Sequence, residues 1–321
     1  TLSLPPLATN NLSHIVAITT IDTSSNDITI RNLNLIGNST TAAPNTGDGI
    51  YVGNAFSISN VVTNATNTIN ILSNRIIAVR SGIIALSPNS ATQSSLDYTI
   101  KSNIIGGEIA PGTAQNTTYI GGVANQSGIW VRGLRNGKID SNIIRNCVPT
   151  AAVSNTFAGI TLSELAGNTL GSVEVTRNSI YNLVTLTGNG TMGIRVNIIG
   201  DGPAAGGPIP VRFVLISNMY IGRLLVNGAG ANHSQLNPNG ISIESGAATN
   251  AAKIYLAHNT VHLSGTGLAN NTSSSACLYL NGNVRGEVEM INNLFVNRMA
   301  RTSTVGNRYA VLVGHTTTPF T

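Results

Sequence analysis

The sequence predicts an all-β solenoid, a coil of parallel strands with about eight recognisable turns, long loops and almost no helix. Two recurring phrases, and the lack of any sustained helical period, predict this fold. The first phrase is apolar, any, apolar, any, any, Asn, any, apolar, as in 69–76 and 254–261. The second is Gly, apolar, any, apolar, as in 49–52 and 128–131, and it alternates with the first.

The first phrase requires the chain to bend at its Asn position. The apolar slots five and three residues before the Asn lie on the same side of a strand, because side chains alternate with a period of two. The apolar slot two residues after the Asn has the opposite parity, so only a bend returns it to the same core. Asn suits such a bend because it tolerates the left-handed backbone conformation.

The repeated Asn predicts a ladder of side chains hydrogen-bonded along the stack of turns. Its members are Asn74, Asn103, Asn142, Asn178, Asn218, Asn259 and Asn293, with Leu33 in the first turn. The slot three residues before the Asn is expected in the core and holds Ile30, Ile71, Ile100, Ile139, Val175, Leu215, Leu256 and Met290. The slot two residues after it holds Leu35, Ile76, Ile105, Ile144, Ile180, Tyr220, Val261 and Phe295.

The second phrase predicts another strand in every turn, entered through a glycine. In the last two turns Cys277 and Ala310 stand in the glycine position. Stacking the turns pairs like strands at about 4.7–4.9 Å and gives a parallel solenoid. An antiparallel sandwich or propeller is the alternative fold. Strict repetition and the scarcity of hairpin dipeptides argue against it.

The domain organisation follows from the span of the repeat. Residues 1–27 are expected to be a lead-in with a first strand near 14–21, and 28–321 one parallel β-helix domain. The longest inserts, near 106–127, 201–211 and 222–239, are expected to be projecting loops. Neither end shows a capping segment, so we expect an uncapped segment of a longer protein, with that protein's neighbouring domains as partners.

Charge and composition argue against two classes of partner. Lys and Arg number 17 against 12 Asp and Glu, giving a net charge of +5, and only 9% of residues are charged. No basic run occurs, so nucleic-acid binding is not expected. No apolar run approaches the roughly 20 residues of a membrane helix, so no membrane span is expected. Cys147 and Cys277, three turns apart, are expected to be free thiols.

Candidate catalytic and metal-binding residues are few. Asp48 lies in a stretch that faintly resembles the Asn-Thr-Asp-Gly motif of polygalacturonases, but an extra glycine breaks the motif and its partners are missing. Glu287 and Glu289 are expected to point outward into solvent. His258 and His262 lie across the Asn bend, where helical spacing does not apply. We therefore expect no catalytic residue, no metal site and no cofactor.

The outward position of the second phrase forms the candidate binding surface. It holds, in order, Tyr51, Ile84, Trp130, Thr161, Arg195, Ser242, Tyr279 and Leu312. Aromatic rings beside an arginine suit sugars or a partner protein, so Tyr51, Trp130, Arg195 and Tyr279 are the predicted binding residues. The alternative is that loops fold over this face and bury the rings.

The repeat resembles that of right-handed parallel β-helix proteins such as pectin-degrading enzymes. Stretches 258–265, 274–280 and 291–297 more closely resemble the β-helix segments of very large cell-surface and secreted proteins of Bacteroidota. The resemblance implies a right-handed parallel β-helix and an extracellular or cell-surface location. Export in that family commonly uses a C-terminal sorting domain of the type IX pathway, which is not recognisable in this chain. The family implies no catalytic residues.

These observations predict a secreted structural or adhesive segment of a larger bacterial surface protein. Its expected ligands are surface glycans, a partner protein, or secretion and surface-assembly proteins. The alternative is a polysaccharide lyase, epimerase or glycoside hydrolase built on a β-helix, for which a cluster of acids in one groove would be needed. Ice binding would need a regular threonine ladder, and the mixed outward column argues against it.

Overall fold

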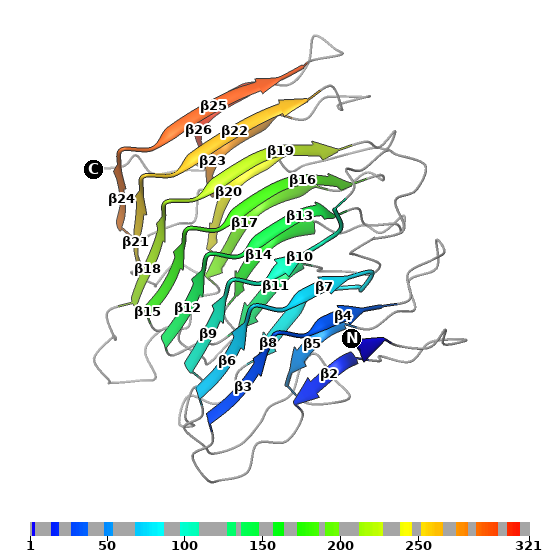
Figure 1. The fold of residues 1–321 in the computed structure, drawn as a ribbon. Coiled ribbons are helices and arrows are strands. Elements are labelled where there is room, and N and C mark those ends of the chain that lie inside the picture. Colours follow the sequence, from blue (N-terminus) through cyan, green and yellow to red (C-terminus); the bar gives the residue numbers. More distant parts are fainter. Residues whose placement is uncertain are drawn as a thin grey trace.

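The computed structural model confirms the predicted all-β fold. Its strands form three parallel sheets in which like strands of successive turns pair (Figure 1). No helix occurs among the residues that it describes. These are residues 2–3, 14–18, 27–37, 48–53, 68–86, 97–108, 127–132, 136–147, 157–163, 172–185, 190–198, 212–226, 238–245, 252–265, 274–281, 287–300 and 307–314.

The strands divide among sheets A, B and C. Sheet A contains β1 (Leu2–Ser3), β4 (Asn34–Ile36), β7 (Arg75–Ile77), β10 (Ile104–Ile105), β13 (Ile143–Cys147), β16 (Ser179–Thr185), β19 (Tyr220–Val226), β22 (Thr260–Gly265) and β25 (Leu294–Met299). Sheet B contains β2 (His14–Ile18), β5 (Asp48–Val52), β8 (Ile83–Leu86), β11 (Ser127–Arg132), β14 (Phe157–Ser163), β17 (Thr191–Ile198), β20 (Asn239–Ser245), β23 (Ser275–Leu280) and β26 (Arg308–Val313). Sheet C contains β3 (Asp27–Arg31), β6 (Thr68–Leu72), β9 (Asp97–Lys101), β12 (Asn136–Asp140), β15 (Ser172–Thr176), β18 (Arg212–Ser217), β21 (Ala252–Ala257) and β24 (Glu287–Ile291).

The two sequence phrases map onto these sheets. The first phrase forms a strand of sheet C, the bend and a strand of sheet A, and the second forms a strand of sheet B. We call such a set of three strands a rung, so that β3, β4 and β5 are the first complete rung and β24, β25 and β26 the eighth. Within 1–27, β1 and β2 pair with β4 and β5. Most residues of the predicted loops lie outside the described residues.

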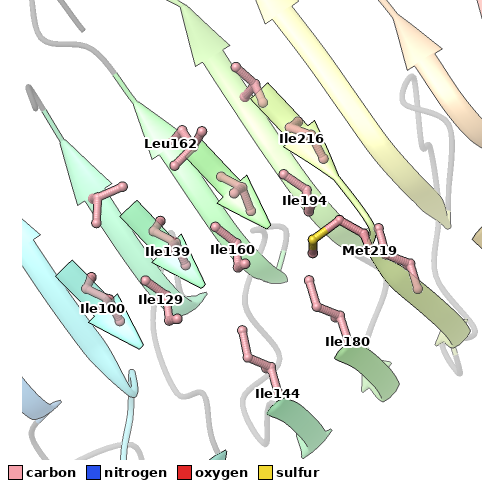
Figure 2. Close-up of a cluster of buried hydrophobic side chains, with 14 of the residues drawn as sticks. Ile100, Ile129, Ile139, Ile144, Ile160, Leu162, Ile180, Ile194, Ile216 and Met219 are labelled. Atoms are coloured by element: carbon pink, nitrogen blue, oxygen red, sulfur yellow. The ribbon is translucent and has the colours of Figure 1, made fainter. Parts of the chain in front are cut away.

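The interior of the coil is filled by the apolar slots of both phrases. Isoleucine and valine side chains from the three sheets meet there and are almost fully buried (Figure 2). β-Branched side chains suit a strand that is buried on one face and stacked on a like strand. Cys147 and Cys277 are buried in this interior, and both are free thiols, as predicted.

The glycine of the second phrase is required by close stacking between rungs. A Cβ at Gly159 would lie 2.6 Å from Ile180 Cγ2 and 2.7 Å from the Gly193 carbonyl oxygen. Both neighbours belong to the following rung, and Gly82, Gly128 and Gly193 face the same kind of contact. The glycine therefore lets each rung approach the next.

The left-handed residue of the bend is the residue before the ladder position, which corrects the expectation that the Asn itself adopts this conformation. These residues have φ between 51° and 58° and are Asn32, Ser73, Ser102, Ser141, Arg177, Asn218, His258 and Asn292. Their side chains are chemically varied. The ladder position is instead selected by its buried hydrogen bonds.

Two sets of hydrogen bonds form the ladder. The backbone N–H at each ladder position donates to the ladder oxygen of the next rung: Leu33 to Asn74 (3.1 Å), Asn74 to Asn103 (2.9 Å), Asn103 to Asn142 (2.9 Å), Asn142 to Asn178 (2.8 Å), Met219 to Asn259 (3.1 Å) and Asn259 to Asn293 (3.0 Å). Each ladder amide donates to a carbonyl oxygen of the preceding rung: Asn74 to Ile30, Asn103 to Ile71, Asn142 to Ile100, Asn178 to Ile139, Asn259 to Ile216 and Asn293 to Leu256. The ladder thus has a direction along the stack.

Asn218 does not belong to the ladder, and the prediction for the sixth rung is wrong by one residue. Met219 holds the ladder position and is buried, whereas Asn218 is exposed with φ 54°. Asn178 N–H donates to the Met219 sulfur at 3.4 Å, a weak acceptor. The same shift replaces Leu215 by Ile216 in the core, and it moves Tyr220 to the outside, 45% exposed.

Candidate functional site

The four predicted binding residues lie in one column on the outer face of sheet B. Strand register pairs Tyr51 with Ile84, Ile84 with Trp130, Trp130 with Thr161, Thr161 with Arg195, Arg195 with Ser242, and Ser242 with Tyr279. Tyr51, Trp130, Arg195 and Tyr279 therefore occupy every second rung. At about 4.7–4.9 Å per rung, successive members lie roughly 10 Å apart along the stack.

Tyr51 does not present its ring to solvent, which contradicts the expectation of an exposed ring there. Its side chain is 2% exposed and packs with Ile84, Leu86 and the partly buried Trp130. His14, from β2, stacks on the phenol with ring centroids 4.2 Å apart and an interplanar angle of 13°. Burial raises the pKa of the Tyr51 hydroxyl, and the Asp48 carboxylate raises it further.

Trp130 is partly exposed and is held in place by polar neighbours. Its indole Nε1–H donates to Ser163 Oγ at 2.8 Å. The Arg132 guanidinium carbon lies 6.0 Å from the centroid of the Trp130 ring, at the outer limit of a cation–π contact. Burial lowers the pKa of Arg132, whereas Tyr51 raises it. The indole is therefore fixed by hydrogen bonding while part of its surface faces solvent.

Arg195 is paired with an acid that the sequence analysis did not single out. Arg195 Nε and Nη2 donate to Glu244 Oε2 at 3.0 and 2.8 Å. Ser242 Oγ donates to the other carboxylate oxygen at 3.0 Å. Glu244 is two residues beyond Ser242, so strand alternation places it on the outer face as well. Its position could have been read from the sequence, although its pairing with Arg195 could not.

Tyr279 closes the column towards the last rungs and is partly exposed. Its pKa is raised by burial and by the Glu244 carboxylate. Tyr279 thus lies near the Arg195–Glu244 pair, and these three side chains form a single polar and aromatic surface. Together with Trp130 they are the part of the predicted site that remains accessible.

Asp48, the residue with the faint polygalacturonase resemblance, is fully buried in a cluster of charged groups. Arg80 Nε and Nη2 donate to its two carboxylate oxygens at 3.0 and 2.7 Å. His14 Nδ1 lies 3.0 Å from Asp48 Oδ2. Both carboxylate oxygens are therefore engaged by the protein. The cluster joins β2 to the first two complete rungs, which is a structural role.

A second buried carboxylate, Asp140, lies at the end of β12. Arg177 Nε and Nη2 donate to it at 2.8 and 2.7 Å, and Thr176 Oγ1 donates at 2.8 Å. Lys101 Nζ lies 3.6 Å away. The hydrogen bond from Arg177 lowers the pKa of Asp140 to about 2, and Thr176 adds to this effect against the opposing influence of burial.

Acid should destabilise the protein through Asp140. Its pKa in the folded chain lies below the usual value near 4. The stabilisation is therefore present above that value and is lost as the pH falls from about 5 towards 2. Urea midpoints between pH 7 and pH 2.5 should fall less steeply for Asp140→Asn than for the unchanged chain. Glu174→Gln, which alters the exposed pair with Lys138 at 3.6 Å, is the control. Parallel curves for the unchanged chain and Asp140→Asn would contradict this assignment.

The corrected register shows one exposed aromatic residue that the sequence analysis placed in the core. Tyr220 lies on the outer face of sheet A, and its ring centroid is 6.5 Å from that of Tyr181 at an angle of 60°. Its phenol end lies against Gly222, two residues along the same strand. The tyrosine–any–glycine spacing is the sequence signal, and it also occurs at Tyr51 and Gly53.

Other candidate groups are dispersed over the described part of the chain. Glu287 and Glu289 are exposed, as predicted, and Lys253 Nζ lies 3.1 Å from Glu287. His258 is the left-handed bend residue of its rung. Among the described residues, no group of three or more His, Cys, Asp or Glu side chains is placed to hold a metal ion. The same residues contain no helix with the length and apolar character of a membrane span.

Comparisons of the chain with protein-family models, with curated proteins and with solved structures found no match.

Proposed function

We propose that this chain is a rigid structural and adhesive segment of a larger extracellular protein, and that the outer face of sheet B binds surface glycans. The observation that carries the proposal is the accessible part of the outward column. Trp130, Arg195 and Tyr279 lie on alternate rungs, and each is partly exposed. An aromatic ring at each end of this surface suits an extended ligand with apolar faces and hydroxyl groups.

The interior supports the structural part of the proposal. A column of buried isoleucine and valine runs through the rungs, and the ladder joins successive bends by buried hydrogen bonds. Such interiors are close-packed and deform little. The outer side chains are consequently held at fixed rung spacings, which is what a repeating ligand requires.

The polar groups between the two rings give the surface donors and acceptors. Glu244 already accepts from Arg195 and Ser242, so the pair is locked in place before any ligand arrives. A sugar hydroxyl can bond either member without leaving a buried charge unpaired. Tyr51, being covered by His14, is left out of the proposed surface.

An extracellular location, with export by the type IX pathway in a member of the Bacteroidota, is part of the same proposal. Its support is the resemblance of the repeat phrases to surface proteins of that group. The low fraction of charged residues, 9%, agrees with a surface made mainly of uncharged polar side chains. Surface proteolysis of intact cells that express the parent protein would test the location.

The enzymatic alternative has no comparable support in the described residues. The two fully buried carboxylates, Asp48 and Asp140, are each held by an arginine through two hydrogen bonds. A hydrolase needs two carboxylates facing one substrate bond. No second candidate function is therefore proposed.

A glycan array tests the binding proposal. The unchanged chain should bind a defined set of glycans, and Trp130→Ala with Tyr279→Ala should reduce that binding at least about tenfold, since each stacked ring contributes on the order of 1 kcal/mol. Tyr255→Ala is the matched control, because Tyr255 lies on the outer face of sheet C against Phe213, with ring centroids 5.0 Å apart. Equal binding by the unchanged chain and the double variant would overturn the proposed surface. Capture of a protein without any glycan signal would favour a partner protein instead.

A further inference from the structure

The last rung exposes residues that are buried in every equivalent place one rung earlier. Met290 is 47% exposed, whereas its register partner Leu256 is fully buried. Val311 and Val313 are each 38% exposed, and their partners Leu278 and Leu280 are 0% and 7% exposed. Figure 1 shows β24, β25 and β26 as the final strands of the stack. The C-terminal end of the stack is thus an apolar surface made of core-type side chains.

The opposite end of the stack is better covered. Ile30 and Leu35 of the first complete rung are 8% and 0% exposed. Ile15, Val16 and Ile28 are partly buried and pack against the core. Solvent exposure of core-type residues is therefore a property of the C-terminal end in particular.

The direction of the ladder specifies what this end can accept. At every earlier ladder position that faces an Asn, the backbone N–H donates to the side-chain oxygen of the next rung. Asn293 uses its own oxygen and amide towards the seventh rung. Among the described residues, no acceptor faces the Asn293 backbone N–H. The group that covers this end should therefore bring an oxygen acceptor to the ladder position.

The edges of the three sheets give the second requirement. β24, β25 and β26 each pair with a strand on one side only within the described residues. All the existing pairings are parallel and in register. A covering segment that continues them consists of parallel strands in the order sheet C, sheet A, sheet B.

The N-terminal end of a second copy does not meet these requirements. Its first ladder position is Leu33, whose side chain has no oxygen acceptor. Its sheets A and B extend one strand further, through β1 and β2, than sheet C, which stops at β3. Stacking two copies end to end would consequently leave a one-strand gap in sheet C.

We propose that the C-terminal end of the stack is a docking surface for one further rung of the same repeat, joined in the same polypeptide and carrying Asn at its ladder position. This interaction surface is separate from the proposed glycan-binding face and does not depend on it. The added rung would bury Met290, Val311 and Val313, and its ladder oxygen would accept from Asn293 N–H.

The experiment joins a second copy of residues 252–281 to the chain after Thr321. Hydrogen exchange should slow at least about tenfold across β24, β25 and β26 relative to the unextended chain, because their free edges become paired. The matched control is the same extension with leucine in place of its ladder Asn, which should give clearly less protection at Asn293. Equal protection by the two extensions would overturn the ladder requirement.

A second substitution guards against an extension that stays unfolded. Met290→Ser should lower the unfolding midpoint more in the extended chain than in the unextended chain, because only the extended chain buries this side chain. Equal shifts in both chains would overturn the docking surface. Sedimentation of the unextended chain should show a monomer whose strands β24 to β26 exchange quickly. A stable dimer with these strands protected would identify a second copy as the occupant and overturn the proposal.

Discussion

Replacing Asn142 with alanine should lower the free energy of unfolding by about 3–5 kcal/mol. Asn142 Oδ1 accepts from Asn103 N and Nδ2 at 2.9 and 3.0 Å, and its Nδ2 donates to the Ile100 carbonyl at 2.9 Å. The substitution leaves the Asn103 backbone N–H and the Ile100 carbonyl buried without these partners. Each such group costs about 1–3 kcal/mol, and the space left by the amide adds to the loss.

Asn218→Ala is the matched control for Asn142→Ala. The sequence phrase assigns the two residues to the same slot, yet Asn218 is exposed and its special feature is φ 54°. Alanine at a left-handed position should cost only about 1 kcal/mol. Urea unfolding monitored by circular dichroism measures both. Losses of similar size would show that the ladder does not distinguish the two positions.

Replacing Gly159 with valine should cost about 3 kcal/mol or more. The first added carbon would meet Ile180 Cγ2 at 2.6 Å and the Gly193 carbonyl oxygen at 2.7 Å, so the fifth rung would have to move away from the fourth. Because one of these contacts is with backbone, a change of side-chain rotamer cannot relieve it. A lower unfolding midpoint, with reduced hydrogen-exchange protection at the β14–β17 pairing, is the expected result.

Ala310→Val tests the same slot where no described rung follows. Ala310 lies opposite Cys277 in the register and is exposed. Its substitution should change the free energy of unfolding by less than about 0.5 kcal/mol. A cost equal to that of Gly159→Val would mean that stacking between rungs is not what excludes a side chain from the slot.

The register of the sixth rung shows where the sequence was ambiguous. Residues 214–221 offer two alignments of the apolar slots, one that puts Asn218 in the ladder and one that puts Met219 there. The first alignment keeps the Asn but would bury Tyr220. The structure buries Ile216 and Ile221 instead. Burying two isoleucines outweighs a weak sulfur acceptor at one ladder position.

The outward column was predictable, but its coverage was not. Strand alternation alone places Tyr51 and Trp130 on the same outer face, and the register bears this out. Coverage depends on contacts between residues far apart in the chain. His14 reaches Tyr51 from the preceding turn, and Glu244 reaches Arg195 from the following rung. No periodic pattern encodes these pairings.

Residue-resolved hydrogen exchange measures the central claim, a directional ladder that runs through the stack and ends at Asn293. The backbone N–H groups of Asn103 and Asn142, which donate to ladder oxygens at 2.9 and 2.8 Å, should be strongly protected. Asn178 N–H, which donates to sulfur at 3.4 Å, should exchange faster, and Asn293 N–H fastest of the four. Uniform protection at all four, or rapid exchange at Asn103 and Asn142, would contradict the account.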